Sequence, residues 1–248
     1  MAELRRSQPP LRVVFAGPSI YGLTIDWTGI ELRRPAQQGD VEAAVANGAM
    51  AIGLVDGHYQ QVGAVWHKEI LLALSKGVRV YGAASMGALR AAECAAFGMI
   101  PVGGIAAGYC RGELFDDADV AVTNGPLELG YPPLTEPMVT VSATVSHLSD
   151  RALLSADERE SILAAARSIY FADRTIDAIF DRAADGPARQ RLFSLYVQNR
   201  IDPKGRDALE LIEAIRGIDE RDAPPAWQLA LSPFWQARDV RSDTVTPL

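Results

Sequence analysis

The stretch from Gly77 to Cys94 constrains the fold more than any other part of this 248-residue chain. Residues 78–83 hold two valines and a tyrosine after a turn glycine, and such a short run of β-formers predicts a buried strand. From Met86 onward alanine, leucine and arginine dominate, and these residues favour a helix. The stretch therefore predicts a strand that passes directly into a helix, with Ser85 at the junction.

The junction itself is built from small residues. Ala83 lies two positions before Ser85 and Gly87 two positions after it, where larger side chains would collide in a sharp turn. The pattern partly matches the nucleophile elbow of serine hydrolases, Gly-x-Ser-x-Gly, with alanine in place of the first glycine. Two interpretations of Ser85 stay open. Serine is a preferred N-cap residue, and a helix N-terminus also stabilises an oxyanion.

Apolar runs alternate with helical patterns along the first half of the chain. The alternation predicts a small parallel, Rossmann-like α/β sheet. We expect strands at residues 12–19, 49–55, 78–83 and 120–123, helices at 41–46, 64–76 and from 86 onward, an irregular segment at 20–37, and room for a short helix in the glycine-rich stretch 101–112.

The second half of the chain has a different texture. A proline-rich connector spans residues 129–137, and helical patterns follow at 137–149, 156–169, 173–184, 188–198 and 204–216. We therefore expect a flexible N-terminal tail (1–11), an α/β core (12–125) and a mainly helical C-terminal region (126–248), whose last residues, 224–248, form a proline-containing tail against the body.

Composition excludes several classes of protein. No apolar run approaches the roughly 18 residues that a membrane span needs, and residues 1–11 lack the apolar core of a signal peptide. A net charge of −7 argues against non-specific nucleic-acid binding. The two cysteines form neither a disulfide framework nor a zinc spacing, which favours a reducing compartment. We expect a cytoplasmic protein without a cofactor.

Polar residues follow three of the predicted strands. Ser19 and Tyr21 follow the first, Asp56 and His58 the second, and Ser85 the third. Parallel α/β sheets bind ligands beyond the carboxyl ends of their strands, so we expect these side chains to share one edge. The next helix starts at that edge too, which would bring His67 and Lys68 to it.

Such an edge has the parts for acyl-group hydrolysis. Ser85 or water could attack, His67 or His58 could move protons, and helix-start amides could hold an oxyanion. Each part also has a structural interpretation, because Asp56-Gly57 is common turn chemistry, His67 could cover a helix rim, and the pair Arg90 and Glu93 could lie on the surface.

The acidic stretch Asp116, Asp117 and Asp119 is interrupted by Ala118 and lacks visible partner ligands, so we predict a solvated loop and no metal site. Gly17-Pro18-Ser19 is not a phosphate loop, because it lacks both Gly-x-Gly-x-x-Gly and a following Gly-Lys. This disfavours a nucleotide- or acyl-phosphate-binding function.

Several blocks of sequence resemble the TfuA-like family. They are residues 55–59 (VDGHY), 65–71 (VWHKEIL), 80–93 (VYGAASMGALRAAE) and 97–99 (FGM), with flanks at 17–19 (GPS) and 116–121 (DDADVA). The resemblance covers residues 12–145 and is most specific in the serine–methionine–glycine block. The helical remainder adds nothing diagnostic.

The resemblance implies a partnership with a YcaO protein, which uses ATP to activate a peptide-backbone amide so that sulfide replaces its oxygen. The TfuA-like partner would supply the sulfur from the C-terminal thiocarboxylate of a small ubiquitin-like carrier protein. The peptide substrate, a ribosomally made natural product or an enzyme being modified, would then be met only indirectly. Two classes of function follow: a thiocarboxylate hydrolase, or a non-catalytic adaptor or activator that docks carrier and YcaO together.

The candidate site combines these interpretations. The strand-end residues supply the candidate catalytic groups Ser85, His67, Lys68 and Asp56. The candidate substrate-binding residues are Gly17, Pro18, Ser19, Tyr21, His58, Glu69, Gly87, Arg90 and Glu93.

Overall fold

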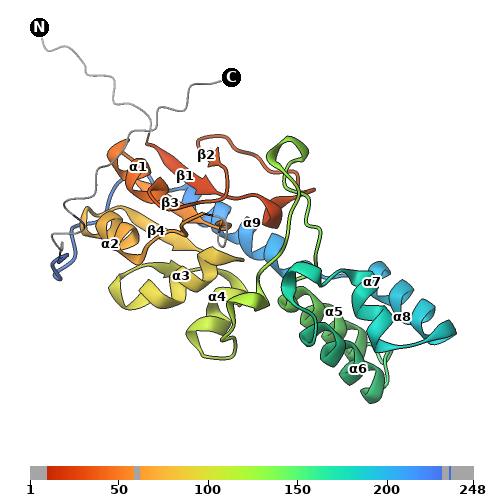
Figure 1. Cartoon of the computed structure of the whole chain (residues 1–248). Helices are drawn as coiled ribbons and strands as arrows, with labels where there is room; N and C mark the ends of the chain where they lie inside the picture. The colour runs from red at the N-terminus through yellow and green to blue at the C-terminus, as the bar shows by residue number, and fades with distance from the viewer. Residues whose placement is uncertain (1–9, 59–61, 231–234, 236–248) are drawn as a thin grey trace, which may run out of the picture.

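The computed structural model describes residues 10–58, 62–230 and Trp235 (Figure 1). Tyr59, most of the expected N-terminal tail and the end of the expected C-terminal tail lie outside these residues. No helix in the described part of the chain combines the length and apolarity that crossing a bilayer requires.

The expected parallel sheet is present and has five strands. Their order across the sheet is β2-β1-β3-β4-β5, and every neighbouring pair is parallel. The strands are β1 (Arg12–Phe15), β2 (Glu31–Arg33), β3 (Ala51–Leu54), β4 (Arg79–Gly82) and β5 (Ile100–Pro101). The Rossmann-like α/β prediction is therefore confirmed, with β1, β3 and β4 as the central strands.

The two edge strands were not predicted. β2 lies in the segment expected to be irregular, and two of its three residues are exposed, so no apolar pattern marks it. β5 is short, exposed and ends in Pro101, which is tolerated at a sheet edge because a proline cannot donate to a ladder.

The strand expected at residues 120–123 is wrong. A 3-10 turn, Asp117–Asp119, precedes this segment, and no strand forms there. Val120 is buried by packing against Ile105 and Val139, so its apolar character reflects a small hydrophobic cluster rather than strand pairing.

Helices cover both faces of the sheet. On one face, α1 (Asp40–Ala46), α2 (His67–Ser75) and α3 (Met86–Cys94) bury their apolar sides against the strands. On the other face lies α9 (Pro203–Arg216), and α4 (Gly103–Cys110) packs against both α3 and α9 (Figure 1). The last of the named helices therefore completes the α/β core.

The close fit of α9 depends on a glycine in β3. A Cβ atom built at Gly53 would lie 2.5 Å from Cδ2 of Leu211, so a larger residue would displace the Leu211 side chain. Leu211, Ile212 and Ile215 are buried there.

The remaining helices form a second packed unit beside the sheet (Figure 1). They are α5 (Met138–Asp150), α6 (Ala156–Arg167), α7 (Ile176–Ala183) and α8 (Gly186–Gln198), which confirms the expected helical region. Short 3-10 helices occupy Pro18–Ile20, Ala95–Phe97, Asp117–Asp119, Leu127–Leu129 and Phe171–Asp173. Tyr196 and Phe180 lie at the centre of this second core.

The described part of the C-terminal segment runs back along the body. The Asp222 amide donates to the Gly77 carbonyl oxygen at 2.8 Å, and Nε1 of Trp227 donates to the Phe97 carbonyl at 3.2 Å. The chain after α9 is therefore tied to the turns that precede β4 and β5.

Candidate functional site

The carboxyl edge of the sheet brings six of the candidate residues together: Gly17, Pro18, Ser19, Asp56, His58 and Ser85. Asp56, His58 and Ser85 line one small cavity of about 20 Å³, and Ser19 is hydrogen-bonded to Asp56. We call this space the strand-end cavity; it has roughly the room that one water molecule needs. Its other walls are Pro18, Pro35, Gly57, Val122 and Asn124.

Asp56 fixes the turn after β1. Its Oδ2 accepts hydrogen bonds from the Gly17 amide at 2.8 Å and the Ser19 amide at 3.0 Å, and its Oδ1 accepts one from the Ser19 hydroxyl at 2.6 Å. The carboxylate is only 3% exposed. Since charge-assisted hydrogen bonds are the strong ones, Asp56 holds the Gly17–Ser19 turn against the end of β3.

Ser85 follows a strained turn. Ala84, just before it, has a φ of 64°, and the Ser85 amide donates to the Ala83 carbonyl at 2.8 Å across this tight turn. Such three-residue turns are rare and cost energy for a non-glycine residue. Ser85 occupies the N-cap position of α3, yet its side chain makes no capping hydrogen bond. The Ser85 side chain therefore lies at the start of the helix without accepting a hydrogen bond from a backbone amide of its first turn.

Gly87 allows α3 to begin directly on the end of β3. Its amide donates to the Val55 carbonyl at 3.2 Å, and a Cβ atom at this position would lie 1.8 Å from the Leu54 carbonyl oxygen. No side chain fits in that space. Gly87, two positions after the serine, thus lets the backbones of α3 and β3 approach closely. This agrees with the small residue that the sequence predicts to be needed there.

His58 is held in place and biased toward its neutral form. Its amide donates to the Ala36 carbonyl at 2.9 Å, and its ring packs edge-on against Tyr131 with centroids 6.5 Å apart. Burial, followed by the nearby Arg34 guanidinium, lowers the pKa of His58 below 6.5. A neutral imidazole can accept a proton, so His58 is available as a base at neutral pH.

The other candidate histidine lies elsewhere. The exposed Nε2 of His67 pairs with Oε2 of Glu93 at 2.8 Å, and Arg90 bonds the same oxygen through Nη1 at 2.6 Å. Glu93 is about two helical turns beyond Ser85 along α3. Residues 62–66 lead toward Glu93, where α2 begins. His67 and the half-buried Lys68 therefore do not line the strand-end cavity.

Glu69 and Arg90 connect secondary-structure elements. The fully buried Glu69 accepts hydrogen bonds from the Gly39 amide at 2.8 Å and the Trp66 amide at 3.2 Å, which ties the starts of α1 and α2 together. Arg90 donates through Nε to the Val65 carbonyl at 3.0 Å. Glu69 lies in the first turn of α2 and Arg90 bonds the segment just before this helix, and neither lines the strand-end cavity.

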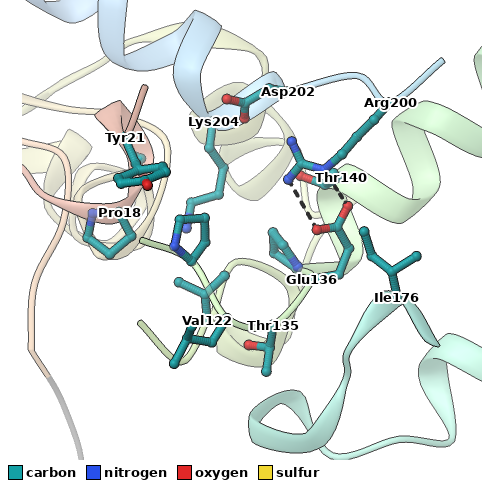
Figure 2. Close-up of a pocket in the computed structure, with 14 residues that line it drawn as sticks. Pro18, Tyr21, Val122, Thr135, Glu136, Thr140, Ile176, Arg200, Asp202 and Lys204 are labelled. Carbon is teal, nitrogen blue, oxygen red and sulfur yellow. Dashed lines mark hydrogen bonds and ion pairs between the residues drawn. The ribbon is translucent and has the colours of Figure 1, made fainter. Parts of the chain in front are cut away.

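A larger cavity lies next to the strand-end cavity, with Pro18 in the wall of both. It has a volume of about 250 Å³ and lies between the turn after β1, the connector residues 133–137 and the start of α9 (Figure 2). We call it the connector cavity. The half-exposed Tyr21 lines it, together with four polar residues that the sequence did not point to: Glu136, Thr140, Arg200 and Lys204.

Glu136 lies in the proline-rich connector, and the other three residues come from the region after it. In Figure 2, Arg200 reaches across to Glu136, and Lys204 extends from α9 toward Pro18. Glu136 is buried and accepts from Nε of Arg200 at 2.7 Å and from the Tyr196 hydroxyl at 2.7 Å. The sequence Asp202-Pro203-Lys204 signals a helix start, but nothing in it shows that the lysine is buried.

The acidic stretch forms a surface turn. The Asp116 side chain accepts from the Ala118 amide at 2.9 Å, and the Asp116 carbonyl accepts from the Tyr109 hydroxyl at 2.7 Å. Among the described residues no three His, Cys, Asp or Glu side chains form a group that could hold a metal ion.

Residues 56–175 match the family model described as TfuA-like protein. This part of the chain is similar to the TfuA-like family. The matched segment contains His58, Ser85 and Glu136, whereas Ser19 and Lys204 lie outside it. No curated protein matches the sequence. The TfuA-like segment therefore supplies the strained turn and the histidine of the strand-end cavity.

Gly87→Ala is expected to destabilise the protein by about 3 kcal/mol or more, because the added methyl group overlaps the end of β3. Gly104→Ala is the matched control, since Gly104 occupies the same position of α4 and its added Cβ would meet only the flexible end of Arg206. Urea unfolding measures both. Equal stability of the two variants would contradict the close approach at Gly87.

Proposed function

We propose that this TfuA-like protein hydrolyses the C-terminal thiocarboxylate of a ubiquitin-like sulfur-carrier protein and passes the sulfide to a YcaO enzyme for peptide-backbone thioamidation. The observation that carries the proposal is the strained turn at Ala84, which presents Ser85 to a cavity shared with a neutral histidine. Strained backbone conformations cluster at functional sites, and this turn does not lead to a capping hydrogen bond from Ser85.

The chemistry is an acyl transfer to water. The Ser85 hydroxyl, or a water in the strand-end cavity, attacks the thiocarboxylate carbon while His58 accepts the proton of the attacking group. The amide of Met86, the residue after Ser85, is the donor that such turns offer to the oxyanion. As the carbon–sulfur bond breaks, the departing sulfur takes the proton back from His58 and leaves as hydrosulfide. If Ser85 attacks, a water molecule then hydrolyses the acyl ester to the carboxylate.

Ser85→Ala is expected to lower the rate of sulfide release from a thiocarboxylated carrier by at least about 10²-fold, because a nucleophile or oxyanion donor is lost. The free energy of unfolding should stay unchanged, since the Ser85 side chain makes no capping bond. Sulfide release and urea unfolding are measured on the same preparations.

Ser155→Ala is the matched control for capping. The Ser155 hydroxyl accepts from the Glu158 amide at the start of α6, so its loss should cost about 0.5–2 kcal/mol without slowing sulfide release. Normal hydrolysis by Ser85→Ala together with reduced stability would make Ser85 a cap and refute its role in acyl chemistry.

The pH dependence tests His58. A general base works when deprotonated, so kcat/KM should rise with pH through the pKa of His58, which lies below 6.5, and should reach its plateau by neutral pH. Arg34→Gln removes a positive charge that lowers this pKa, and the midpoint of the acid limb should therefore move upward. His67→Gln should leave the midpoint in place, because His67 pairs with Glu93. An acid limb that ignores Arg34 would exclude His58 as the base.

A non-catalytic adaptor is the second candidate function. Three leucines of the connector region, Leu127, Leu129 and Leu134, are more than half exposed, and exposed apolar residues close together are typical of docking surfaces. An adaptor would activate YcaO or hold the carrier against it without releasing sulfide.

Reconstituted thioamidation separates the two candidates. With YcaO, ATP and peptide at low sulfide, product formation should be weak and should rise when this protein and a thiocarboxylated carrier are added. High free sulfide should remove the need for both, because a sulfide supplier is bypassed by its product. Continued dependence on this protein at high sulfide would favour the adaptor.

A further inference from the structure

The connector cavity contains a buried lysine that forms no ion pair with a described carboxylate. Lys204 is 4% exposed, and its Nζ donates to the Val120 carbonyl oxygen at 2.8 Å. Among the described residues it forms no ion pair. Burial lowers the pKa of Lys204, whereas the charges of Asp56, Asp202 and Glu136 act in the opposite direction. An ammonium that keeps donor capacity inside a cavity is suited to hold an anion.

A second polar group in the same cavity lacks a partner. Thr140 is fully buried at the first turn of α5, and its hydroxyl is the one buried side-chain oxygen or nitrogen in the described part of the chain that has no hydrogen-bond partner. Leaving a buried hydroxyl unsatisfied is costly, and a bound water, ion or ligand is one explanation for such a group in a native protein. Thr140 lines the connector cavity with Lys204.

The neighbouring acids restrict the charge of the ligand. Asp56 and Glu136 are buried and already occupied by the Gly17–Ser19 turn and by Arg200, and Asp202 caps the Gly205 amide at 3.0 Å. These carboxylates repel a dianion such as phosphate more strongly than a singly charged anion beside Lys204.

The remaining walls favour an organic group. Val122, Pro133, Pro137 and Ile176 contribute apolar surface, and the volume of about 250 Å³ exceeds that of a bare ion. A ligand that fits combines one carboxylate with a short, mostly apolar body.

We propose that the connector cavity binds the carboxylate of a small organic monoanion, with the Lys204 ammonium and the Thr140 hydroxyl as donors. The carboxylate could belong to the C-terminus of a peptide chain or to a free small acid. This inference does not depend on the proposed hydrolysis, because it concerns the binding of a carboxylate that carries no sulfur.

Calorimetric titration of the full chain tests the ligand class. N-acetylalanine, a model chain terminus, should bind saturably with one site, and N-acetylalaninamide, identical except for its charge, should bind at least about tenfold more weakly. Inorganic phosphate should also bind more weakly than N-acetylalanine. Propionate distinguishes the two sources: tighter binding of N-acetylalanine indicates a chain terminus, and equal or tighter binding of propionate indicates a free acid.

Two variants test the donors. Lys204→Met should weaken N-acetylalanine binding by roughly 10–100-fold, and Thr140→Val by roughly 2–10-fold, as expected for a charged and a neutral donor. Lys76→Met, at the exposed end of α2, is the control and should bind normally. The melting temperature of Thr140→Val should stay equal or rise, because the substitution removes an unsatisfied hydroxyl.

Three results would overturn the inference: equal binding of the acid and its amide, phosphate binding as tightly as the carboxylate, or Thr140→Val binding like the unmodified protein. If Lys204→Met does not fold, Thr140→Val decides the matter alone. Its near-isosteric side chain leaves the packing around α5 in place.

Discussion

The contact between the start of α3 and the end of β3 controls the geometry of the carboxyl edge. A hydrogen atom is all that fits on Gly87 against the Leu54 carbonyl oxygen, and the Gly87 amide is bonded to Val55. To reach this position from β4 the chain takes a positive φ at Ala84. Ser85 therefore lies near the segment that carries Asp56. The packing of α3 on the sheet compensates for the strain of the turn.

Asp56 connects the end of β3 to the other segments at this edge of the sheet. Its three hydrogen bonds fix the turn after β1, and its charge lies close enough to Lys204 to raise the pKa of that lysine against the effect of burial. Lys204 belongs to α9, whose place is set by Leu211 fitting over Gly53 in β3. The two cavities thus depend on the same central strand, which approaches α3 at its end and α9 at its middle.

The sequence was sufficient for the central strands and the helices but not for the edges of the sheet. β1, β3 and β4 are buried on both faces and read as continuous apolar runs, which local patterns detect. β2 is largely exposed and β5 contains a proline, so their pairing is decided by the neighbouring strand rather than by their own residues. The apolar segment 120–123 was wrongly predicted to be a strand, because Val120 is buried against helices and not in a sheet.

The same distinction separates the parts of the site that could be predicted from those that could not. Ser85, Asp56 and His58 directly follow strands, and parallel strands deliver such residues to one edge. The position of His67 depends on the path of the loop before α2, and Lys204 meets Asp56 across nearly 150 positions of sequence, so no local pattern contains either fact. Pro18 joins the predictable and unpredictable halves, since it walls both cavities. The connector cavity therefore borders the turn that Asp56 holds, and residues of both the α/β core and the helical region line it.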